Sequence, residues 1–354
     1  MKIVSLELKN FRNYEYYQYN FNNNLVLIVG NNGVGKTNVL EALYLLSTNR
    51  SFRTYDNISL INNNTPIDYS SISCKLVKNE NIYNLKVNIE EKNKRLFIDN
   101  SLINKSSDFI GNLNAVCFIP SQLNLFNESP KYRRNFFDSE LAKLSKSYTK
   151  NLNSYLSVIK NRNILLKEKS IDNDLITVFN QQLSNLNMKI GQQRSKLVDK
   201  INNLINDKFY SLTRENIGKI SIKYFTNIDI NSLESNMNLY KNYLERDQLL
   251  KFTSIGVHKD DFKFYINNHK IEEYCSSGQC RLVLLATKLV FVDIIKEIIK
   301  DVPILLLDDI LSELDDLKIK NLFDVLDSKQ QVFITTTSIN KNLINRNFQL
   351  IKVG

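Results

Sequence analysis

The sequence predicts an α/β fold in which a β-sheet core is interrupted by a long helical insertion. Two apolar runs, at residues 25–29 and 303–307, are typical of strands buried on both faces. A glycine-rich loop follows the first run at once, and two adjacent aspartates follow the second. The residues between these runs become mainly helical in pattern from position 121. We therefore expect one α/β domain at 1–120 and 246–354, with a helical domain inserted at 121–245.

The N-terminal part is expected to be mostly β. A first strand is predicted by the alternating apolar residues Val4, Leu6 and Leu8. Apolar residues at 39–46 have helical spacing, so a helix follows the glycine-rich loop. Residues 71–103 divide into short β runs separated by polar turns, and residues 115–119 form a strand that Pro120 ends. This order predicts a strand–loop–helix unit followed by an antiparallel β subdomain.

The inserted segment is expected to be a bundle of antiparallel helices with a turn at 172–174. Its apolar residues recur every seven positions, at Leu183, Ile190, Leu197 and Leu204. β structure returns at 261–266, and Asn267 and Asn268 are typical of a hairpin turn. A helix and two closing strands are predicted at residues 277–300, 331–335 and 350–353.

Composition limits the classes of protein that fit. The chain has 354 residues, of which 43% are hydrophobic and 24% charged, as in globular proteins. The net charge of +10 favours a polyanionic partner, although an AT-rich coding bias also produces many lysines. No run reaches the ~20 apolar residues of a membrane span, and the N-terminus lacks the apolar segment of a signal peptide. We expect a cytoplasmic location, no membrane partner and reduced cysteines.

The glycine-rich loop matches the phosphate-loop pattern in full. Glycine lets the loop amides point at phosphates, and the following helix N-terminus favours negative charge. Lys36 supplies a positive charge for the β- and γ-phosphates, and Thr37 offers its hydroxyl to Mg²⁺. A chance glycine-rich turn is the alternative, and the buried strand before the loop argues against it. The predicted ATP-binding residues are Gly30, Asn31, Asn32, Gly33, Val34, Gly35, Lys36 and Thr37.

Asp308 and Asp309, after the second apolar run, are typical of the second nucleotide-binding motif. Asp308 is predicted to bind Mg²⁺ and Asp309 to polarise the attacking water. Two adjacent acids can also form a solvated turn. Because a phosphate loop is present in the same chain, we favour a role for Asp308 and Asp309 in nucleotide binding and hydrolysis.

A third motif opens the helix that precedes Asp308. Hydroxyl and amide groups at a helix start can bind a γ-phosphate, and we predict this role for Ser276, Ser277, Gly278 and Gln279. The alternative is a simple helix cap. The order of phosphate loop, Ser-Gly-Gln and Asp-Asp is that of ABC-type ATPase heads. In such ATPases this element reaches the nucleotide of the opposite subunit.

Five stretches make the chain resemble the RecF recombination-repair family. They are residues 8–14, 30–37, 129–138, 256–261 and 305–315, so the resemblance covers nearly the whole chain. SMC-type ATPases share the first and last motifs but separate them by hundreds of heptad residues. The sequence departs from the family in three stretches. Ser121 and Gln122 replace acidic residues, Val257 and Lys259 replace a proline and an arginine, and Cys280 replaces a glutamine.

The resemblance implies roles for further residues. Arg12 and Asn13 are expected to lie against the nucleotide. Gln122 is expected to sense Mg²⁺ and water, so we group it with Lys36 and Asp309 as catalytic. Alternatives stay open elsewhere. Arg133 and Arg134 fit a DNA phosphate contact or an ion pair with Asp138, and His258 fits a mechanistic or a structural role.

The resemblance also implies a function. ATP joins two subunits into a clamp on DNA at single-strand gaps and single/double-strand junctions, and slow, DNA-stimulated hydrolysis releases it. RecR and RecO are implied partners in loading RecA. Two other classes of protein share some of these motifs. They are a nucleotide-binding subunit of a membrane ABC transporter and a stand-alone nucleotide kinase. The absence of a switch histidine after residues 331–334 disfavours the transporter. The distance between the two nucleotide motifs disfavours the kinase.

Overall fold

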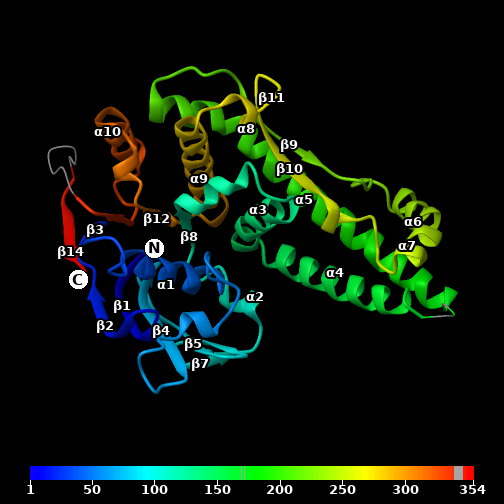
Figure 1. Cartoon of the computed structure of the whole chain (residues 1–354), viewed down its shortest axis with the longest axis horizontal. Coiled ribbons are helices and arrows are strands. Elements are labelled where there is room, and N and C mark those ends of the chain that lie inside the picture. Colours follow the sequence, from blue (N-terminus) through cyan, green and yellow to red (C-terminus); the bar gives the residue numbers. More distant parts are fainter. Residues whose placement is uncertain (169, 171, 339–345) are drawn as a thin grey trace. The chain divides into compact units, whose positions relative to one another are not determined.

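The structure is a computed structural model that describes residues 1–168, 170, 172–338 and 346–354. The chain divides into two compact units (Figure 1). The first, which we call the sheet unit, contains Met1–Leu123, Asp207–Asn216 and Ser276–Gly354. The second, the helical unit, contains Asn124–Asn206 and Ile217–Cys275. None of the helices in the described ranges is long and apolar enough to cross a bilayer.

A five-stranded parallel sheet forms the centre of the sheet unit. Its strands are ordered β14 (Phe348–Lys352), β3 (Leu25–Val29), β13 (Val332–Thr336), β12 (Ile304–Asp308) and β8 (Ala115–Phe118). All four neighbouring pairs are parallel, so the carboxyl ends of the strands meet at one edge. The side chains of β12 and β13 are buried throughout, as expected of strands covered on both faces.

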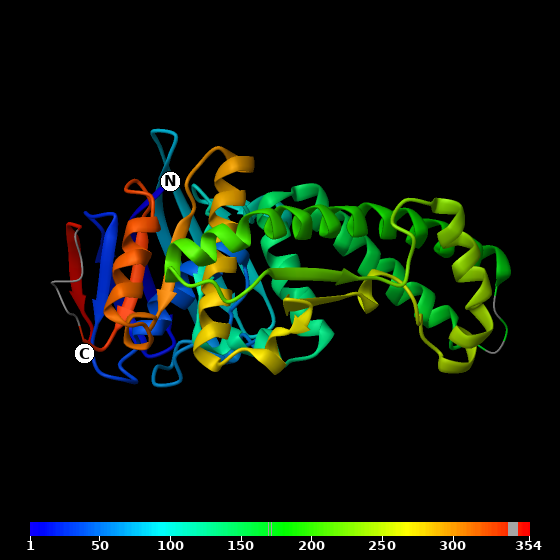
Figure 2. The ribbon, with the colours of Figure 1, turned by 90° about the horizontal axis from the view of Figure 1, so that it is seen from above.

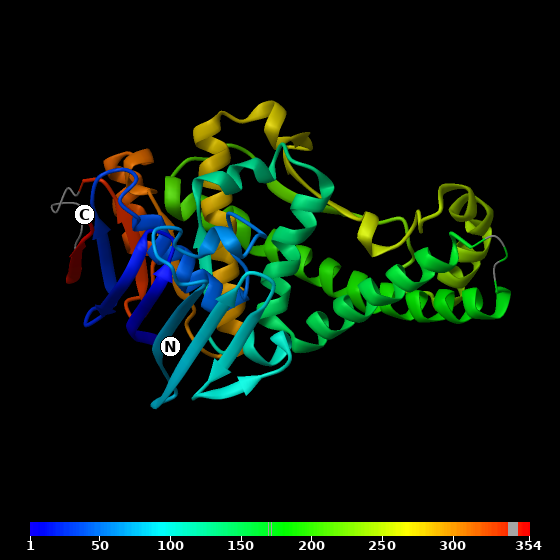
Figure 3. The same ribbon diagram turned by 60° about the horizontal axis from the view of Figure 1, so that its bottom comes forward.

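A six-stranded antiparallel sheet forms the second layer of this unit. Its order is β2 (Tyr14–Asn20), β1 (Lys2–Phe11), β4 (Tyr69–Lys78), β5 (Asn81–Glu90), β6 (Lys94–Ile98) and β7 (Ser101–Ile103). Figure 3 shows these strands side by side, in blue to cyan. Helix α1 (Lys36–Thr48) contacts both sheets, and it is buried along nearly its whole length because its residues are mostly apolar. The expected mixed β structure is thus divided between two sheets.

Three more helices complete the sheet unit. They are α2 (Ser106–Phe109), α9 (Ser277–Ile299) and α10 (Asp316–Val325). Helix α9 is almost fully apolar after its first turn and contacts β8. The last residues of the long helix α5 (Asn173–Thr213) also belong to this unit, because the Asn321 side chain donates to Leu212 O at 3.0 Å.

The helical unit is built around α4 (Lys146–Leu165) and α5 (Asn173–Thr213), which run side by side (Figure 2). The other helices are α3 (Pro130–Leu144), α6 (Leu233–Asn242), α7 (Leu244–Leu250) and α8 (Ile271–Tyr274). A buried ion pair joins Arg162 on α4 to Asp247 on α7 at 2.7 Å, and neither side chain is exposed. The Arg162 side chain also donates to Asn180 on α5 at 2.9 Å. These contacts fix three helices around one buried cation.

A three-stranded sheet covers part of this unit. Its order is β11 (His269–Lys270), β10 (Asp261–Ile266) and β9 (Ile220–Phe225). The hairpin turn at Asn267 and Asn268 is confirmed, since both residues have positive φ, 46° and 68°. Strand β9 lies in a region where the pattern predicted helices. The alternation of Ile220 and Ile222 with polar residues was the signal for it.

The compact units do not follow the predicted boundaries of 121–245 for the insertion. Residues 246–275 group with the helical unit because β10 pairs with β9 over its whole length. Residues 207–216 group with the sheet unit, where Glu215 forms an ion pair with Lys318 at 3.2 Å.

The seven-residue repeat in α5 is only partly realised. Leu183, Ile190 and Leu197 are buried, but the core then passes to Ile201 and Ile205. An unsupercoiled helix drifts against a strict seven-residue repeat, so Leu204 is only half-buried.

Candidate nucleotide-binding site

The phosphate loop lies between β3 and α1, at the carboxyl edge of the parallel sheet. Two of its glycines cannot be replaced without a clash. A Cβ at Gly30 would lie 2.2 Å from Val353 O, and one at Gly35 would lie 2.6 Å from the Asn13 amide nitrogen. Gly35 also has a φ of +108°, which side chains disfavour. The loop is therefore shaped by contacts as well as by backbone freedom.

The Lys36 ammonium already lies within this loop. Its Nζ donates to Gly30 O and Asn31 O, both at 2.8 Å, and the residue is only 8% exposed. A lysine held in this way has its ammonium group beside the loop amides. Those amides open α1, whose N-terminal end favours an anion. The arrangement suits a polyphosphate.

Asp308 ends β12 and is bonded to hydroxyls from two neighbouring elements. Thr37 Oγ1 donates to Asp308 Oδ1 at 2.8 Å, and Thr335 Oγ1 donates to the same oxygen at 2.6 Å. Burial raises the pKa of the Asp308 carboxyl, and the hydrogen bonds from Thr335 and Thr37 oppose that rise. Mg²⁺ is usually bound by one or two protein oxygens together with phosphates and waters. Thr37 and Asp308 therefore fit Mg²⁺.

Two acceptor oxygens near this edge are buried without a hydrogen-bond partner in the described part of the chain. They are Asp309 Oδ1 and Gln122 Oε1. Asp309 has a φ of +50°, and its amide donates to Thr335 O at 3.1 Å. Gln122 follows β8, the strand next to β12, and is 7% exposed. Buried unpaired acceptors suit a site that takes in water or a cation. The catalytic roles predicted for both residues stay predictions.

The predicted Ser-Gly-Gln motif is a reciprocal helix cap. The Ser276 hydroxyl accepts from Gln279 N at 3.2 Å, and the Gln279 side chain accepts from Ser276 N at 3.0 Å. Ser276, Ser277 and Gly278 are exposed, and a Cβ at Gly278 would meet only the Ser276 hydroxyl, at 3.9 Å. The first turn of α9 is therefore open to another molecule.

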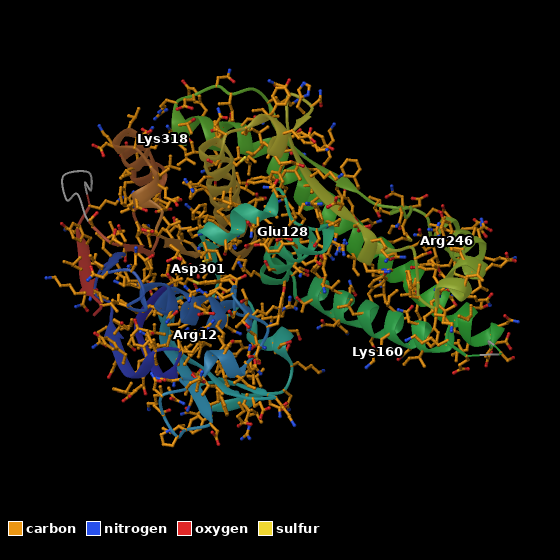
Figure 4. All side chains as sticks on the ribbon, viewed as in Figure 1. Arg12, Glu128, Lys160, Arg246, Asp301 and Lys318 are labelled. Carbon is orange, nitrogen blue, oxygen red and sulfur yellow. The ribbon has the colours of Figure 1, made fainter. Side chains whose placement is uncertain are left out.

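Arg12 and Asn13 lie beside α1 (Figure 4 labels Arg12). The Asn13 side chain donates to Val34 O at 2.9 Å, so it contacts the phosphate loop. The Arg12 guanidinium instead forms an ion pair with Glu41 at 2.6 Å and donates to Ser59 O at 2.7 Å. Binding of nucleotide by Arg12 stays a prediction.

Three residues of this site were not predicted from the sequence. Glu41 is fully buried on α1, where it pairs with Arg12 and, at 3.7 Å, with Arg53. The charge of Arg53 also lowers the pKa of the Asp308 carboxyl and so opposes the rise caused by burial. Thr335, the third, holds Asp308. A buried acid within an otherwise apolar helix face was the available signal for Glu41, since such an acid needs a cationic partner.

The structure shows the partners of Arg133 and Arg134. Arg133 forms a two-pronged ion pair with Asp261, at 2.7 and 3.0 Å, and not with Asp138. Asp138 pairs with Arg194 at 2.9 Å. Arg134 donates to Asp260 O at 2.6 Å. The predicted partner Asp138 was wrong because a distant segment of α5 reaches it.

His258 has a structural environment. Its Nδ1 accepts from the Tyr155 hydroxyl at 2.7 Å, and its Nε2 donates to Thr253 O at 3.0 Å. Burial lowers the pKa of His258 to about 4. The neutral ring therefore joins α4 to the loop before β10.

The fold and this site define an ATPase head of the ABC class. The sequence matches the family described as RecF/RecN/SMC N terminal domain over residues 2–354. A solved Smc head bound to the C-winged helix domain of ScpA shares the fold, with a TM-score of 0.50 at 16% identity. That match covers 95% of this chain and 89% of the Smc chain.

Within that class, the chain belongs to the RecF family. It is 38% identical to the DNA replication and repair protein RecF of Oenococcus oeni, over 96% of this chain and 94% of the relative. The RecF of Acholeplasma laidlawii is 37% identical, over 94% and 93%. The solved structure of the recombination mediator protein RecF with ATP, in the RecFOR pathway, has a TM-score of 0.88 at 28% identity. It covers 96% of this chain and 92% of that chain.

Proposed function

We propose that this chain is a DNA-binding ATPase of replication and repair, in which ATP joins two copies and hydrolysis separates them. One observation carries the proposal: Lys36 lies inside the phosphate loop, while Thr37 contacts Asp308 at the same edge of the sheet. The relatives named DNA replication and repair protein RecF support the DNA-directed role.

In this proposal the phosphate loop binds ATP, and Thr37 and Asp308 hold Mg²⁺, which neutralises phosphate charge. Asp309 takes a proton from the attacking water, and Gln122 orients that water. Their unpaired buried oxygens support these roles, because each has a free acceptor to offer. Turnover is slow, since the complete site forms only when two subunits meet.

The second half of each site comes from the partner subunit. The exposure of Ser276, Ser277 and Gly278 at the start of α9 supports this step, because another molecule can reach this turn. A γ-phosphate from another copy can accept from the hydroxyls and amides of this turn and gain from the α9 dipole. ATP therefore acts as the contact that joins the two copies.

The closed dimer clamps DNA at single-strand gaps and single/double-strand junctions in the cytoplasm. There it works with RecR and RecO in loading RecA, and DNA stimulates its weak ATPase activity. The net charge of +10 supports binding to a polyanion. The solved RecF structure from the RecFOR pathway supports the choice of partners.

The decisive experiment measures oligomeric state and DNA affinity together, with and without ATP. Sedimentation velocity reports the dimer, and fluorescence anisotropy reports binding to a gapped duplex. We expect ATP to convert monomer to dimer and to tighten DNA binding, with affinity falling as salt rises. A monomer whose DNA affinity is the same with and without ATP would contradict the proposal.

A further inference from the structure

The three-stranded sheet of the helical unit gathers lysines and aromatic rings on one exposed side. Antiparallel register sets Lys223 opposite Lys263, and sets Tyr265 opposite Ser221 on one side and Lys270 on the other. Alternate residues of a strand share a face. We call the side formed by these residues together with Phe225 the lysine–aromatic face. On the opposite side, the buried residues are Ile220, Ile222, Phe262, Phe264 and Ile266.

The rings and the cations on this face alternate across the strands. Lys223 Nζ lies 4.6 Å from the centre of the Tyr265 ring, and Lys263 Nζ lies 5.7 Å from that of Phe225. Phe225 is 44% exposed, which is high for a phenylalanine in a regular strand. Lys223 and Lys263 are directly opposed, and like charges in such a pair are destabilising. A bound anion would relieve that repulsion.

Two acidic groups that border the face have basic partners. Asp261 is paired with Arg133 at 2.7 Å, and Glu273 is paired with Lys270 at 2.6 Å. Among the ion pairs of the described residues, none involves Lys223 or Lys263. The charges of Lys223 and Lys263 are therefore not offset by an ion pair within the described residues.

The face is held rigid from behind. Two asparagines one turn apart on α5 hydrogen-bond to the outer edge of β9. Asn202 donates to Ile222 O at 2.9 Å and accepts from Ile222 N at 2.7 Å. Asn206 does the same with Ile220, at 3.0 and 2.8 Å. These amides satisfy the edge strand as another strand would. A ligand then meets a preformed surface and loses little affinity to ordering it.

We propose that the lysine–aromatic face binds single-stranded DNA. This rests on the proposed function, which supplies DNA as the ligand. Rings at the surface of a sheet stack on unpaired bases, and lysines between them neutralise the phosphates. Here Phe225 is exposed and Tyr265 is half-buried. A duplex hides its base faces, and an acidic protein segment would need the lysines but not the two rings. Since residues 221–225 and 263–270 include no residue of the nucleotide site, this binding is independent of ATP.

A single-tryptophan reporter tests the stacking directly, because the chain contains no tryptophan. In Y265W protein, the indole should be quenched when an oligothymidylate of roughly 16 nucleotides is added without ATP. Tyr16→Trp is the matched control, because Tyr16 is 57% exposed on the antiparallel sheet of the other unit. Its fluorescence should not respond. An unquenched Y265W protein that still binds the oligonucleotide would overturn the proposal.

Affinity measurements test the rings and the lysines separately. Phe225→Ala and Tyr265→Ala should each weaken binding by roughly 5- to 100-fold, as expected for the loss of one stacked base. Replacing Lys223 and Lys263 by Gln should lower the salt slope by roughly 0.7 per lysine. The control is Lys150→Gln with Lys160→Gln, which removes equal charge from exposed positions on α4 (Figure 4 labels Lys160).

The outcomes separate this inference from the proposed function. If the lysine variants bind less but both ring variants bind normally, the face is a site for another anion and the inference is wrong. If all variants equal the parent while ATP still tightens binding to a gapped duplex, only the inference fails. A parent protein that binds neither the gapped duplex nor the oligothymidylate would contradict the proposed function itself.

Discussion

Single buried groups give the candidate site its geometry, and Lys36 is one example. Its ammonium bonds two loop carbonyls, so it holds the loop in shape and also supplies charge. A methionine of similar length would do neither.

Lys36→Met should therefore abolish ATP binding. The loss of charge-assisted hydrogen bonds to phosphate predicts a decrease of at least ~100-fold. Titration with a fluorescent ATP analogue measures it. Lys320→Met, at an exposed position on α10, is the control and should bind normally. Normal affinity in the K36M protein would mean that the loop assignment is wrong.

His258 should make the helical unit sensitive to acid. Its pKa is about 4 in the folded protein and 6.5 in a free side chain, so the unfolded chain binds the proton more readily. Stability from this residue is complete above pH ~6.5 and is lost as pH falls toward ~4, by up to roughly 3 kcal/mol.

Urea unfolding at about pH 7 and about pH 5 checks this, with His258→Gln as the comparison. Glutamine can accept from Tyr155 and donate to Thr253, but it does not titrate. The parent should lose more stability than the H258Q protein between the two pH values. Equal losses would show that other groups control the acid response.

At the scale of elements, the first turn of α9 combines a structural cap with a proposed contact to a second subunit. The cap is satisfied within the helix, and yet its residues remain exposed.

Ser276→Arg should leave ATP binding intact and prevent ATP-induced dimers. The arginine removes the hydroxyl and occupies the space that the partner's γ-phosphate needs. Size-exclusion chromatography with ATP measures the dimer. Ser232→Ala is the control, because it removes an equivalent cap from α6, worth about 1 kcal/mol, without touching this turn. Dimers that persist in the S276R protein would refute the shared-site arrangement.

At the scale of the whole molecule, hydrolysis is proposed to set the lifetime of the dimer on DNA. Asp309 links ATP hydrolysis to the lifetime of the dimer on DNA, because its carboxylate is the proposed base.

Asp309→Asn should preserve ATP binding and dimer formation but lower the hydrolysis rate by roughly 10²- to 10⁴-fold. Dimers on DNA should then dissociate more slowly after a challenge with excess unlabelled DNA. Phosphate release and the decay of anisotropy measure the two effects. Slow hydrolysis with an unchanged dimer lifetime would show that ATP hydrolysis does not control the release of DNA, and would contradict the proposal.

Much of the fold could be predicted from contiguous residues. The phosphate loop, the buried strands before it and before Asp308, and the helix α9 depend on glycine placement, apolar runs and periodicity. Those signals are local, so the predicted elements at 277–300, 331–335 and 350–353 are confirmed as α9, β13 and β14. Strand β9 was the main omission, because its six residues follow a long helical region.

Contiguous residues alone were enough to show that a phosphate loop, a helix beginning with Ser-Gly-Gln and an aspartate pair occur in the order of an ABC-type head. The partners of individual charges, in contrast, follow from how distant segments pack. Arg12 meets Glu41, Arg133 meets Asp261, and Asp308 receives Thr335. That packing also brought β9 beside β10 and so created the lysine–aromatic face. The reason is physical: loops and helices follow from neighbours in the chain, whereas ion pairs and strand pairs depend on which distant segments meet.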